Sequence, residues 1–239
     1  MKQYNGFEII HFGTLASTND TALEYSRCAG GEKKVIWADK QTAGRGRRGR
    51  VWQSLDGNLF FSLLLEFPLK DLGKLVLAAS LALAETVKYL QPEADVKLKW
   101  PNDLLLNGAK VSGMLLEKGE NDYMIVGIGV NVKQSPDAKD ILYPAISLRA
   151  VGIEITAEQF LNLYIEKFAK TVQLSAHKLR EKWLQYALGL GKMIAVRQES
   201  VTEEGVFVGL DDNADLLLQV GAEIRKIYAG DVFLVKEEK

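Results

Sequence analysis

The chain contains very little cysteine and histidine. Among its 239 residues there is one cysteine, Cys28, and there are two histidines, His11 and His177. A single cysteine excludes a disulfide within the chain and is typical of a reducing compartment, so we expect a cytoplasmic protein. Neither histidine stands near a Ser–Asp or Cys–His grouping, and no Cys/His cluster with metal-ligand spacing occurs. The sequence therefore indicates neither a catalytic triad nor a zinc site.

Long apolar segments and an excess of charge are absent as well. No stretch of about 18 apolar residues occurs, so we expect no transmembrane helix. The N-terminal segment, residues 1–13, has no apolar run typical of a signal peptide. The formal net charge is −1, whereas a general nucleic-acid binder is usually basic, so any basic site must be local. Hydrophobic residues make up 47% of the chain, enough to bury a core around an internal cleft.

The hydrophobic pattern predicts an α+β protein with two domains. Residues 1–188 form the larger domain, in which a helix starts at residue 17, a second occupies 72–90, and two more follow Thr156. Strands of this domain are predicted at 8–12, 35–38, 58–67, 97–100, 103–106, 110–117 and 122–132. Residues 189–239 form the smaller domain. Its five short strands, at 192–197, 200–210, 214–220, 222–228 and 231–235, suggest a small barrel.

The most informative segment is rich in arginine and glycine. Residues 44–50 read GRGRRGR, with four arginines within six residues. Glycines let the backbone approach a ligand closely, and the arginine forks suit phosphate or carboxylate. We interpret this segment as an anion-binding loop. Its glycines also match G-x-G-x-x-G, but a dinucleotide-binding fold needs a helix directly after them, whereas an apolar strand follows here.

Other interpretations of this loop stay open. A run of charges is usually a solvated loop, and the arginines could hold nucleic-acid phosphates. The near-zero net charge weighs against the second interpretation without excluding it. Trp52, next to the loop, could stack on a flat base or belong to the core.

Three further motifs carry polar groups. KWPND at 99–103 places Asn102 and Asp103 at a strand start, where they could reach a cleft or simply form a turn. Lys110 could cap a sheet edge, or it could face a pocket and stabilise negative charge. GIGVN at 127–131 combines two strand glycines, which mark close backbone approach or plain sheet packing, with the amide of Asn131. The chain has cationic groups but no obvious nucleophile, which suits nucleotidyl transfer by positioning and charge neutralisation.

Taken in order, these motifs resemble the biotin–protein ligase family. Ser17-Thr18-Asn19 precedes GRGRRGR at 44–50, KWPND at 99–103, Lys110-x-x-Gly113 and GIGVN at 127–131. The arginine–glycine stretch and KWPND in this order are highly specific, and the resemblance covers nearly the whole chain. It implies a catalytic domain with a mixed sheet and helices on one side, followed by a small SH3-like barrel.

The resemblance also implies a reaction. Biotin reacts with ATP and Mg²⁺ to give biotinyl-5′-AMP and pyrophosphate, and a lysine of a biotin carboxyl carrier protein then attacks this anhydride. The implied catalytic residues are Lys110, Arg47 and Asp103. The implied biotin-binding residues are Ser17, Thr18, Asn19, Gln41, Gly44, Arg45, Lys110 and Gly113. The implied ATP-binding residues are Arg47, Arg48, Arg50, Trp52, Asn102, Lys110 and Asn131. The sequence does not indicate which residues hold Mg²⁺.

The implied roles are specific. Lys110 would offset charge between the biotin carboxylate and the α-phosphate, and Arg47 would hold the phosphate. Asp103 would orient the incoming lysine. Because the acyl-adenylate is reactive, we expect the arginine–glycine loop to close over it and to be mobile without ligand.

Several expectations concern partners and alternatives. The Ser-Thr-Asn motif begins at residue 17, which leaves no room for the N-terminal winged helix-turn-helix of bifunctional members, so we expect no specific DNA binding. A homodimer is plausible. A lipoate–protein ligase or octanoyltransferase, which shares the catalytic fold, is the nearest alternative function. A non-catalytic biotin sensor or nucleic-acid module is a distant one, against which Lys110 argues.

Overall fold

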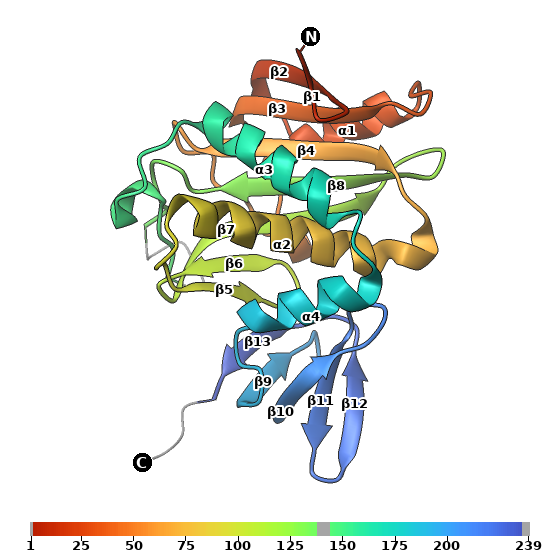
Figure 1. Cartoon of the computed structure of the whole chain (residues 1–239), viewed down its shortest axis with the longest axis vertical. Coiled ribbons are helices and arrows are strands. Elements are labelled where there is room, and N and C mark those ends of the chain that lie inside the picture. Colours follow the sequence, from red (N-terminus) through yellow and green to blue (C-terminus); the bar gives the residue numbers. More distant parts are fainter. Residues whose placement is uncertain (1, 138–143, 236–239) are drawn as a thin grey trace.

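Two sheets form the framework of the protein. The structure, a computed structural model, describes residues 2–137 and 144–235. Its larger sheet has the strand order β1-β2-β3-β4-β8-β7-β6-β5, in which β2 and β3 are parallel and the other neighbours are antiparallel (Figure 1). These strands are β1 (Lys2–Tyr4), β2 (Phe7–Leu15), β3 (Lys33–Gln41), β4 (Leu59–Glu66), β5 (Val96–Lys99), β6 (Asp103–Leu106), β7 (Ala109–Lys118) and β8 (Tyr123–Val130).

The central strands are apolar on both faces. β4, with the sequence LFFSLLLE, is buried at every position except its last, and β8 is buried throughout. A continuous apolar run of this kind, rather than strict alternation, is expected where both faces of a sheet are covered. Both predicted strands, 58–67 and 122–132, are therefore confirmed at the centre of the sheet.

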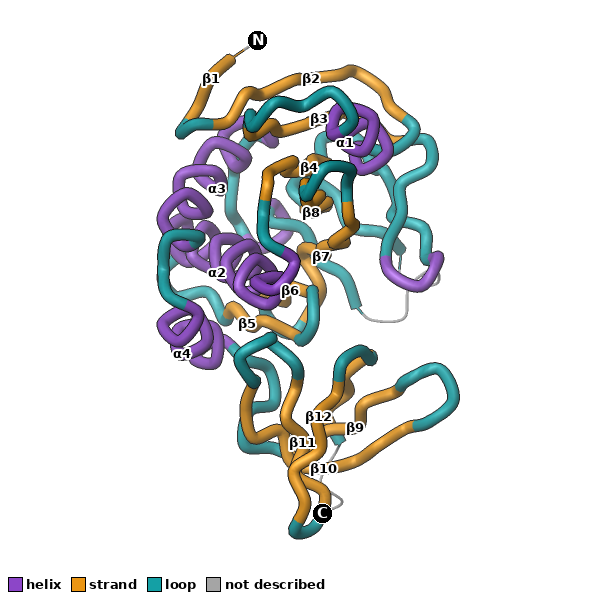
Figure 2. Tube along the Cα trace, turned by 90° about the vertical axis from the view of Figure 1, so that its right-hand side faces the viewer, coloured by secondary structure: helices purple, strands orange, loops and turns teal. Residues whose placement is uncertain are grey.

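Helices cover both faces of this sheet, although unequally. α2 (Leu72–Leu90), α3 (Ala157–Thr171) and α4 (Ala176–Tyr186) lie on one side, while the short α1 (Thr18–Ser26) lies on the other (Figure 2). The expectation of helices on one side therefore holds for three helices, and α1 corrects it. Alternation along β3 explains the arrangement. Val35 and Trp37 join the core beneath α2 and α3, whereas Ile36 packs with Ala22 of α1.

Local signals position several elements. α2 has the predicted bounds, 72–90. Thr156 and Gln159 form the predicted capping box, with mutual hydrogen bonds of 3.2 and 3.0 Å. Asn107 and Gly108 both have positive φ, 51° and 79°, in the predicted β6–β7 hairpin. Short 3₁₀ segments, Arg47–Gly49, Leu69–Asp71 and Arg149–Val151, complete the helical structure described.

β1 was not predicted. Its three residues carry no alternating pattern, but the Asn5-Gly6 turn that joins it to β2 is itself a hairpin signal, with φ of 47° and 80°. β2 and β3 also extend beyond the predicted strands at 8–12 and 35–38. The parallel pairing of the two strands carries the ladder past their apolar segments.

The second sheet is small and antiparallel, with the order β12-β11-β10-β9-β13. It confirms the expected C-terminal β domain of five strands. The strands are β9 (Met193–Arg197), β10 (Thr202–Leu210), β11 (Leu216–Val220), β12 (Glu223–Ile227) and β13 (Asp231–Leu234). The predicted boundary near residues 188–190 falls between α4 and β9. No helix in the described part of the chain is long and apolar enough to cross a membrane.

The two sheets share one apolar core. Ile194 and Phe207 of the second sheet belong to the same buried cluster as the apolar face of α2. The Trp100 indole N–H donates to the carbonyl of Ala214 across the junction at 2.9 Å. At Gly73, at the start of α2, an added Cβ would lie 2.3 Å from the backbone of Asn213. Only glycine allows this close approach.

Candidate active site

A cavity of about 420 Å³ lies on the sheet face that carries α1, since Thr18 and Asn19 of that helix line it. It collects residues from segments that are far apart in the sequence. These are the start of α1, the end of β3, the arginine–glycine loop and Trp52 after it, the β5–β6 turn, β7, β8 with the segment that follows it, and the start of β13. Of the residues predicted for the site, all except Gly44 and Arg48 line it. The predicted residues that line the cavity are Ser17, Thr18, Asn19, Gln41, Arg45, Arg47, Arg50, Trp52, Asn102, Asp103, Lys110, Gly113 and Asn131.

Three glycines of β7 and β8 leave the cavity floor as bare backbone. Gly113 pairs with Gly129 across the two strands. A Cβ added at Gly129 would lie 2.3 Å from Trp52 Cε2, and one at Gly113 would lie 3.0 Å from Trp52 Cζ3. A Cβ at Gly127 would lie 2.2 Å from Asn19 Oδ1. The floor therefore admits the Trp52 indole at one end and the Asn19 amide at the other.

One end of the cavity is polar but uncharged. Ser17, Thr18 and Asn19 are all at least 95% buried. Ser17 is the N-cap of α1, but its side chain makes no capping hydrogen bond and lines the cavity instead. The Thr18 N–H and hydroxyl both donate to Gln41 Oε1, at 2.8 and 3.1 Å. These contacts fix the orientation of the Gln41 amide.

The Asn19 side chain is held from two sides. The Ser62 hydroxyl lies 2.6 Å from Asn19 Oδ1 and 2.8 Å from the Thr18 hydroxyl. Asn19 Nδ2 donates to Glu117 Oε2 at 2.6 Å. A buried network with satisfied partners is rigid, so this end of the cavity is preorganised.

The other end of the cavity is cationic. Lys110 Nζ lies 2.7 Å from Asp103 Oδ1 and 5.4 Å from the centre of the Trp52 ring. The contact with Asp103 is an ion pair, but its angles are not those of a hydrogen bond. Arg47 donates to Asn102 Oδ1 at 3.1 Å, and Asn102 in turn donates to the Met114 carbonyl at 2.7 Å. Burial lowers the pKa of Arg47, but a guanidinium stays charged at neutral pH.

Lys99 lies behind this cationic end and is 5% exposed. Burial is the main reason why its pKa falls to about 8, while the charges of Asp103 and Asp231 act in the opposite direction. Its Nζ lies 5.4 Å from the centre of the Phe233 ring of β13. KWPND thus supplies a second, deeper cation at the junction of the two domains.

Arg45 and Asn131 line the cavity while their side chains are engaged elsewhere. Both terminal nitrogens of Arg45 donate to Asp20 at 2.7 Å, and this hydrogen bonding is the main cause that raises the pKa of Arg45. Asn131 Nδ2 donates to the Ile146 carbonyl at 3.2 Å. Asn131 therefore holds the backbone at residues 145–146, where Ala145 forms a parallel bridge with Lys110.

Gly44 and Arg48 stand outside the cavity. A Cβ at Gly44 would lie 2.8 Å from the Trp52 carbonyl, so this glycine permits the loop to close on itself. Arg48 has a left-handed backbone, φ 57° and ψ 38°. Its side chain points to Asp231 of β13, 3.3 Å away, rather than to the cavity.

Sequence reasoning missed part of the lining. The most informative of the missed residues is Asp231, an acidic residue from the second domain. It carries no local signal, because only the packing of the two domains brings it to the loop. The others are Gly46, Val51, Gln53, Met114, Leu115, Gly127, Ile128, Gly129, Pro136 and Ala145. Of these, Gly127 and Gly129 could have been found from GIGVN, where close backbone approach was one of two interpretations.

Within the residues described, no group of three or more His, Cys, Asp or Glu side chains is arranged to hold a metal ion. The site thus combines a neutral hydrogen-bonding pocket, a bare backbone floor and a cationic end that contains Lys110 and the partly buried Arg47. This arrangement defines a protein that binds a small molecule with a neutral polar head beside an anionic group.

Known proteins share this arrangement. Residues 13–131 match the Biotin/lipoate A/B protein ligase family, and residues 189–235 match the Biotin protein ligase C terminal domain. The biotin–[acetyl-CoA-carboxylase] ligase of Paracoccus denitrificans is 36% identical over 236 residues, which cover 92% of this chain and 98% of that protein. The bifunctional ligase/repressor BirA of Bacillus subtilis is 36% identical over 248 residues, covering 96% of this chain and 74% of that protein.

A solved structure agrees with these relatives. The biotin protein ligase of Aquifex aeolicus, in complex with biotin and ATP, superposes with a TM-score of 0.82 at 29% identity and covers 96% of this chain and 99% of that one. The chain belongs to the biotin protein ligase family. The family predicted from the motifs is confirmed.

Proposed function

We propose that this protein is an ATP-dependent biotin–protein ligase. The observation that carries the proposal is the single cavity in which a neutral, preorganised pocket adjoins Lys110, Arg47 and Asn102. Biotin has a neutral ureido head and an acidic tail, and ATP is an anion. The two ends of the cavity match these two requirements in the right order.

Biotin occupies the neutral end in this proposal. A ureido group needs both donors and acceptors, which Ser17, Thr18 and Gln41 supply. The Gln41 oxygen is engaged by Thr18, so its amide N–H groups are oriented to donate. The Arg45 guanidinium is held by Asp20, so we assign to Arg45 a backbone contact with biotin and the anchoring of the loop.

The first step joins two anions. A biotin carboxylate oxygen attacks the α-phosphorus of ATP, the bond from this phosphorus to the bridging oxygen breaks, and pyrophosphate leaves with the electron pair. Lys110 offsets charge at this junction, and Arg47 holds the phosphate. Trp52 packs against the adenine, and Arg50, Asn102 and Asn131 lie on the nucleotide side.

The second step transfers the acyl group. The carrier lysine attacks the acyl carbon of biotinyl-5′-AMP, the carbon–oxygen bond to phosphate breaks, AMP leaves, and the amine loses a proton. Asp103 orients this amine. Because Asp103 pairs with Lys110 at 2.7 Å, we propose an exchange in which Lys110 turns to the phosphate and leaves the carboxylate for the amine.

Among the described residues, no group of side chains forms a cage for magnesium in this cavity. The carboxylates that line it within the described part of the chain, Asp103 and Asp231, each face cationic side chains. We therefore propose that Mg²⁺ arrives with ATP, held mainly by phosphate oxygens and water, as is common for this ion. No step above depends on its placement.

The acceptor proposed is a biotin carboxyl carrier protein, and the location proposed is the cytoplasm. Homodimer formation and the absence of specific DNA binding stay predictions. Biotin-dependent binding to an operator fragment in a mobility-shift assay would contradict the second of these.

The decisive experiment is mass spectrometry after incubating the protein with biotin, ATP and Mg²⁺, without a carrier. A bound mass equal to biotinyl-5′-AMP, with pyrophosphate in solution, is expected. A carrier domain should then gain biotin, and its variant with arginine in place of the acceptor lysine should not. Adduct formation with lipoate or octanoate alone would favour the sister acyl specificity. Tight biotin binding without pyrophosphate would favour a sensor.

The loop offers an independent test. We expect trypsin to cut the arginine–glycine loop more slowly when biotin and ATP are both present, because the loop closes over the reactive intermediate. Cleavage after Arg225 or Lys226 of β12, which does not line the cavity and lies at the opposite edge of the second sheet from β13, serves as the internal control. Equal loop cleavage with and without ligands would contradict closure.

A further inference from the structure

The C-terminal domain contributes one side chain to the cavity, and this side chain holds the arginine–glycine loop. Asp231 stands at the start of β13 and lines the cavity with Arg50. Its carboxylate accepts hydrogen bonds from Arg50 and, at 3.3 Å, from Arg48. The Asp231 side chain is 14% exposed, whereas the side chains of its partners Arg48 and Arg50 are 27% and 45% exposed. The carboxylate is thus largely shielded from water, and the arginines reach it from the surface.

The arginine side chains of the loop contact both domains. Arg47 turns toward the larger domain and donates to Asn102 of KWPND at 3.1 Å. Arg48 and Arg50 turn toward Asp231 of the smaller domain. Left-handed backbone at Arg48 and Gly49, φ 57° and 70°, sends consecutive arginines to opposite partners. This conformation is uncommon for a residue other than glycine.

The charges around Asp231 keep its carboxylate ionised, so that it forms charged hydrogen bonds with the loop arginines. Burial alone would raise the pKa of Asp231, but the hydrogen bond from Arg50 and the charges of Arg50, Arg48 and Lys99 outweigh it and lower the pKa. The carboxylate is therefore ionised at neutral pH. Hydrogen bonds between ionised partners are among the stronger ones in proteins.

We propose that Asp231 is a positioning residue for the nucleotide: through it the C-terminal domain holds the arginine–glycine loop so that Arg47 faces the phosphates. This inference rests on the proposed function for its kinetic readout only. It makes the C-terminal domain part of the active site. Asp20 of the larger domain holds Arg45 at the start of the loop, whereas Asp231 holds Arg48 and Arg50 at its end, on the far side of Arg47.

The sign of the effect separates positioning from simple electrostatics. A carboxylate on the wall of a triphosphate site repels the nucleotide, so removing its charge would improve ATP binding if charge alone mattered. Positioning predicts weaker ATP binding instead, because the loop would lose the anchor that Asp231 provides. The two explanations therefore predict opposite changes in the KM for ATP.

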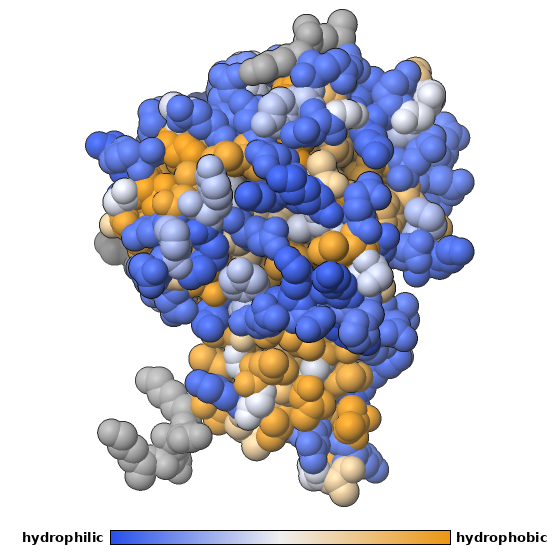
Figure 3. Space-filling view, in the orientation of Figure 1, coloured by the Kyte–Doolittle hydropathy of each residue, from blue (hydrophilic) through white to orange (hydrophobic). Residues whose placement is uncertain are grey.

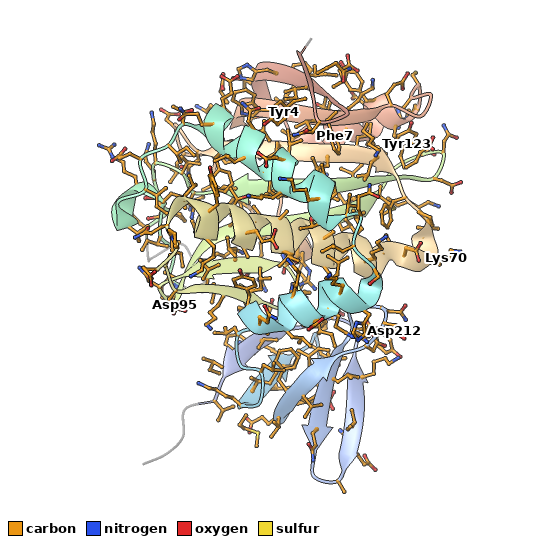
Figure 4. All side chains as sticks on the ribbon, in the orientation of Figure 1. Tyr4, Phe7, Lys70, Asp95, Tyr123 and Asp212 are labelled. Atoms are coloured by element: carbon orange, nitrogen blue, oxygen red, sulfur yellow. The ribbon has the colours of Figure 1, made fainter. Side chains whose placement is uncertain are left out.

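The test compares Asp231→Asn with a matched control, Asp212→Asn. Asp212 pairs with Arg180 of α4 and also joins the two domains, but it does not line the cavity (Figure 4). Three measurements are made on each variant: the KM and kcat for ATP in pyrophosphate release, biotin affinity by calorimetry, and the rate of tryptic cleavage in the loop without ligands.

We expect Asp231→Asn to raise the KM for ATP roughly tenfold with a much smaller change in kcat, to leave biotin affinity unchanged, and to speed loop cleavage several-fold. Asp231→Glu should recover most of the loss, and Asp212→Asn should match the wild type. An unchanged or lower KM for ATP, or unchanged loop cleavage, in Asp231→Asn would overturn the proposal. If the wild type consumes no ATP, the proposed function fails, while loop cleavage still decides whether Asp231 anchors the loop.

Discussion

At the scale of single residues, the site depends on cations whose partners are close at hand. Lys110 sits between the Asp103 carboxylate and the Trp52 ring, and Arg47 is held by the Asn102 amide. A cation fixed in this way needs little reorganisation when charge develops beside it, which is the condition under which electrostatic stabilisation contributes most to catalysis.

Replacing Lys110 with alanine should therefore slow adenylate formation roughly 10²- to 10³-fold. Binding of biotin through its ureido head should persist, because the neutral pocket that we assign to this head does not include the Lys110 ammonium, which we place at the biotin carboxylate. The measurement is single-turnover pyrophosphate release without a carrier, and Arg47→Ala is expected to act in the same direction. Lys97→Ala is the matched control, since Lys97 lies on β5 of the same sheet with its side chain 40% exposed and does not line the cavity. Intact adenylate formation in Lys110→Ala would remove the proposed role.

The lowered pKa of Lys99 should make the stability of the protein depend on pH. Its pKa is lowered from 10.5 to about 8, chiefly by burial, with Asp103 and Asp231 opposing and Lys110 and Arg50 assisting this shift. Between these two values the unfolded chain binds more protons than the folded protein, so the contribution of Lys99 to the free energy of unfolding rises with pH.

The test is urea denaturation of the wild type and of Lys99→Met. We subtract the free energy of unfolding of the variant from that of the wild type. This difference should increase by on the order of 1 kcal/mol between about pH 7.5 and about pH 9.5. Because the comparison is a difference between two proteins, other titrating groups cancel. A difference that stays constant over this range would show that the pKa of Lys99 is not lowered.

At the scale of elements, a single strand, β8, contacts both halves of the site. Gly127 and Gly129 face the same side of β8, two residues apart. The first lies against Asn19 at the neutral end, and the second lies against the Trp52 indole near the cationic end. One strand thus sets the depth of both binding pockets through the absence of two side chains.

Adding one methyl group at each position should separate the two substrates. Gly127→Ala should weaken biotin binding, because its Cβ would meet Asn19 Oδ1 at 2.2 Å, and Gly129→Ala should raise the KM for ATP, because its Cβ would meet the indole at 2.3 Å. We expect roughly tenfold or larger effects, since overpacking of this kind costs about 1–3 kcal/mol. Gly13→Ala is the control, as nothing lies within 4 Å of its Cβ position. Equal effects of both variants on both substrates would contradict this division.

At the scale of the whole molecule, the second sheet depends on the first. It exposes many large apolar side chains, and Figure 3 shows apolar surface gathered over this domain. These residues are Leu190, Met193, Val201, Val208, Ile224, Tyr228 and Leu234. A unit this small buries little surface by itself, and its inner face packs into the core that α2 also lines.

We therefore expect the two domains to unfold together, in a single calorimetric transition. Trp100→Phe, which removes the hydrogen bond to Ala214, should lower the free energy of unfolding by about 1 kcal/mol and keep one transition. Two separate transitions in the wild type, or independent folding of residues 1–188 with unchanged stability, would contradict the shared core.

Much of this protein could be predicted from local patterns. The bounds of α2, the capping box at Thr156 and the turn at Asn107-Gly108 depend on neighbours within a few residues, and the chain alone determines them. The same holds for the motifs that indicated the family. Their residue types specify the chemistry of a ligand even where the position of the ligand is unknown.

Tertiary structure decided what depends on distant contacts. The placement of α1 on the opposite face, the parallel extension of β2 and β3, and the arrival of Asp231 beside Arg48 and Arg50 come from packing of segments up to 183 residues apart. No local pattern encodes such pairings, because a carboxylate at a strand start looks the same whether it faces solvent or a loop of another domain. The sequence determined which groups the site contains, and the fold decided which of them face the cavity and which hold the others in place.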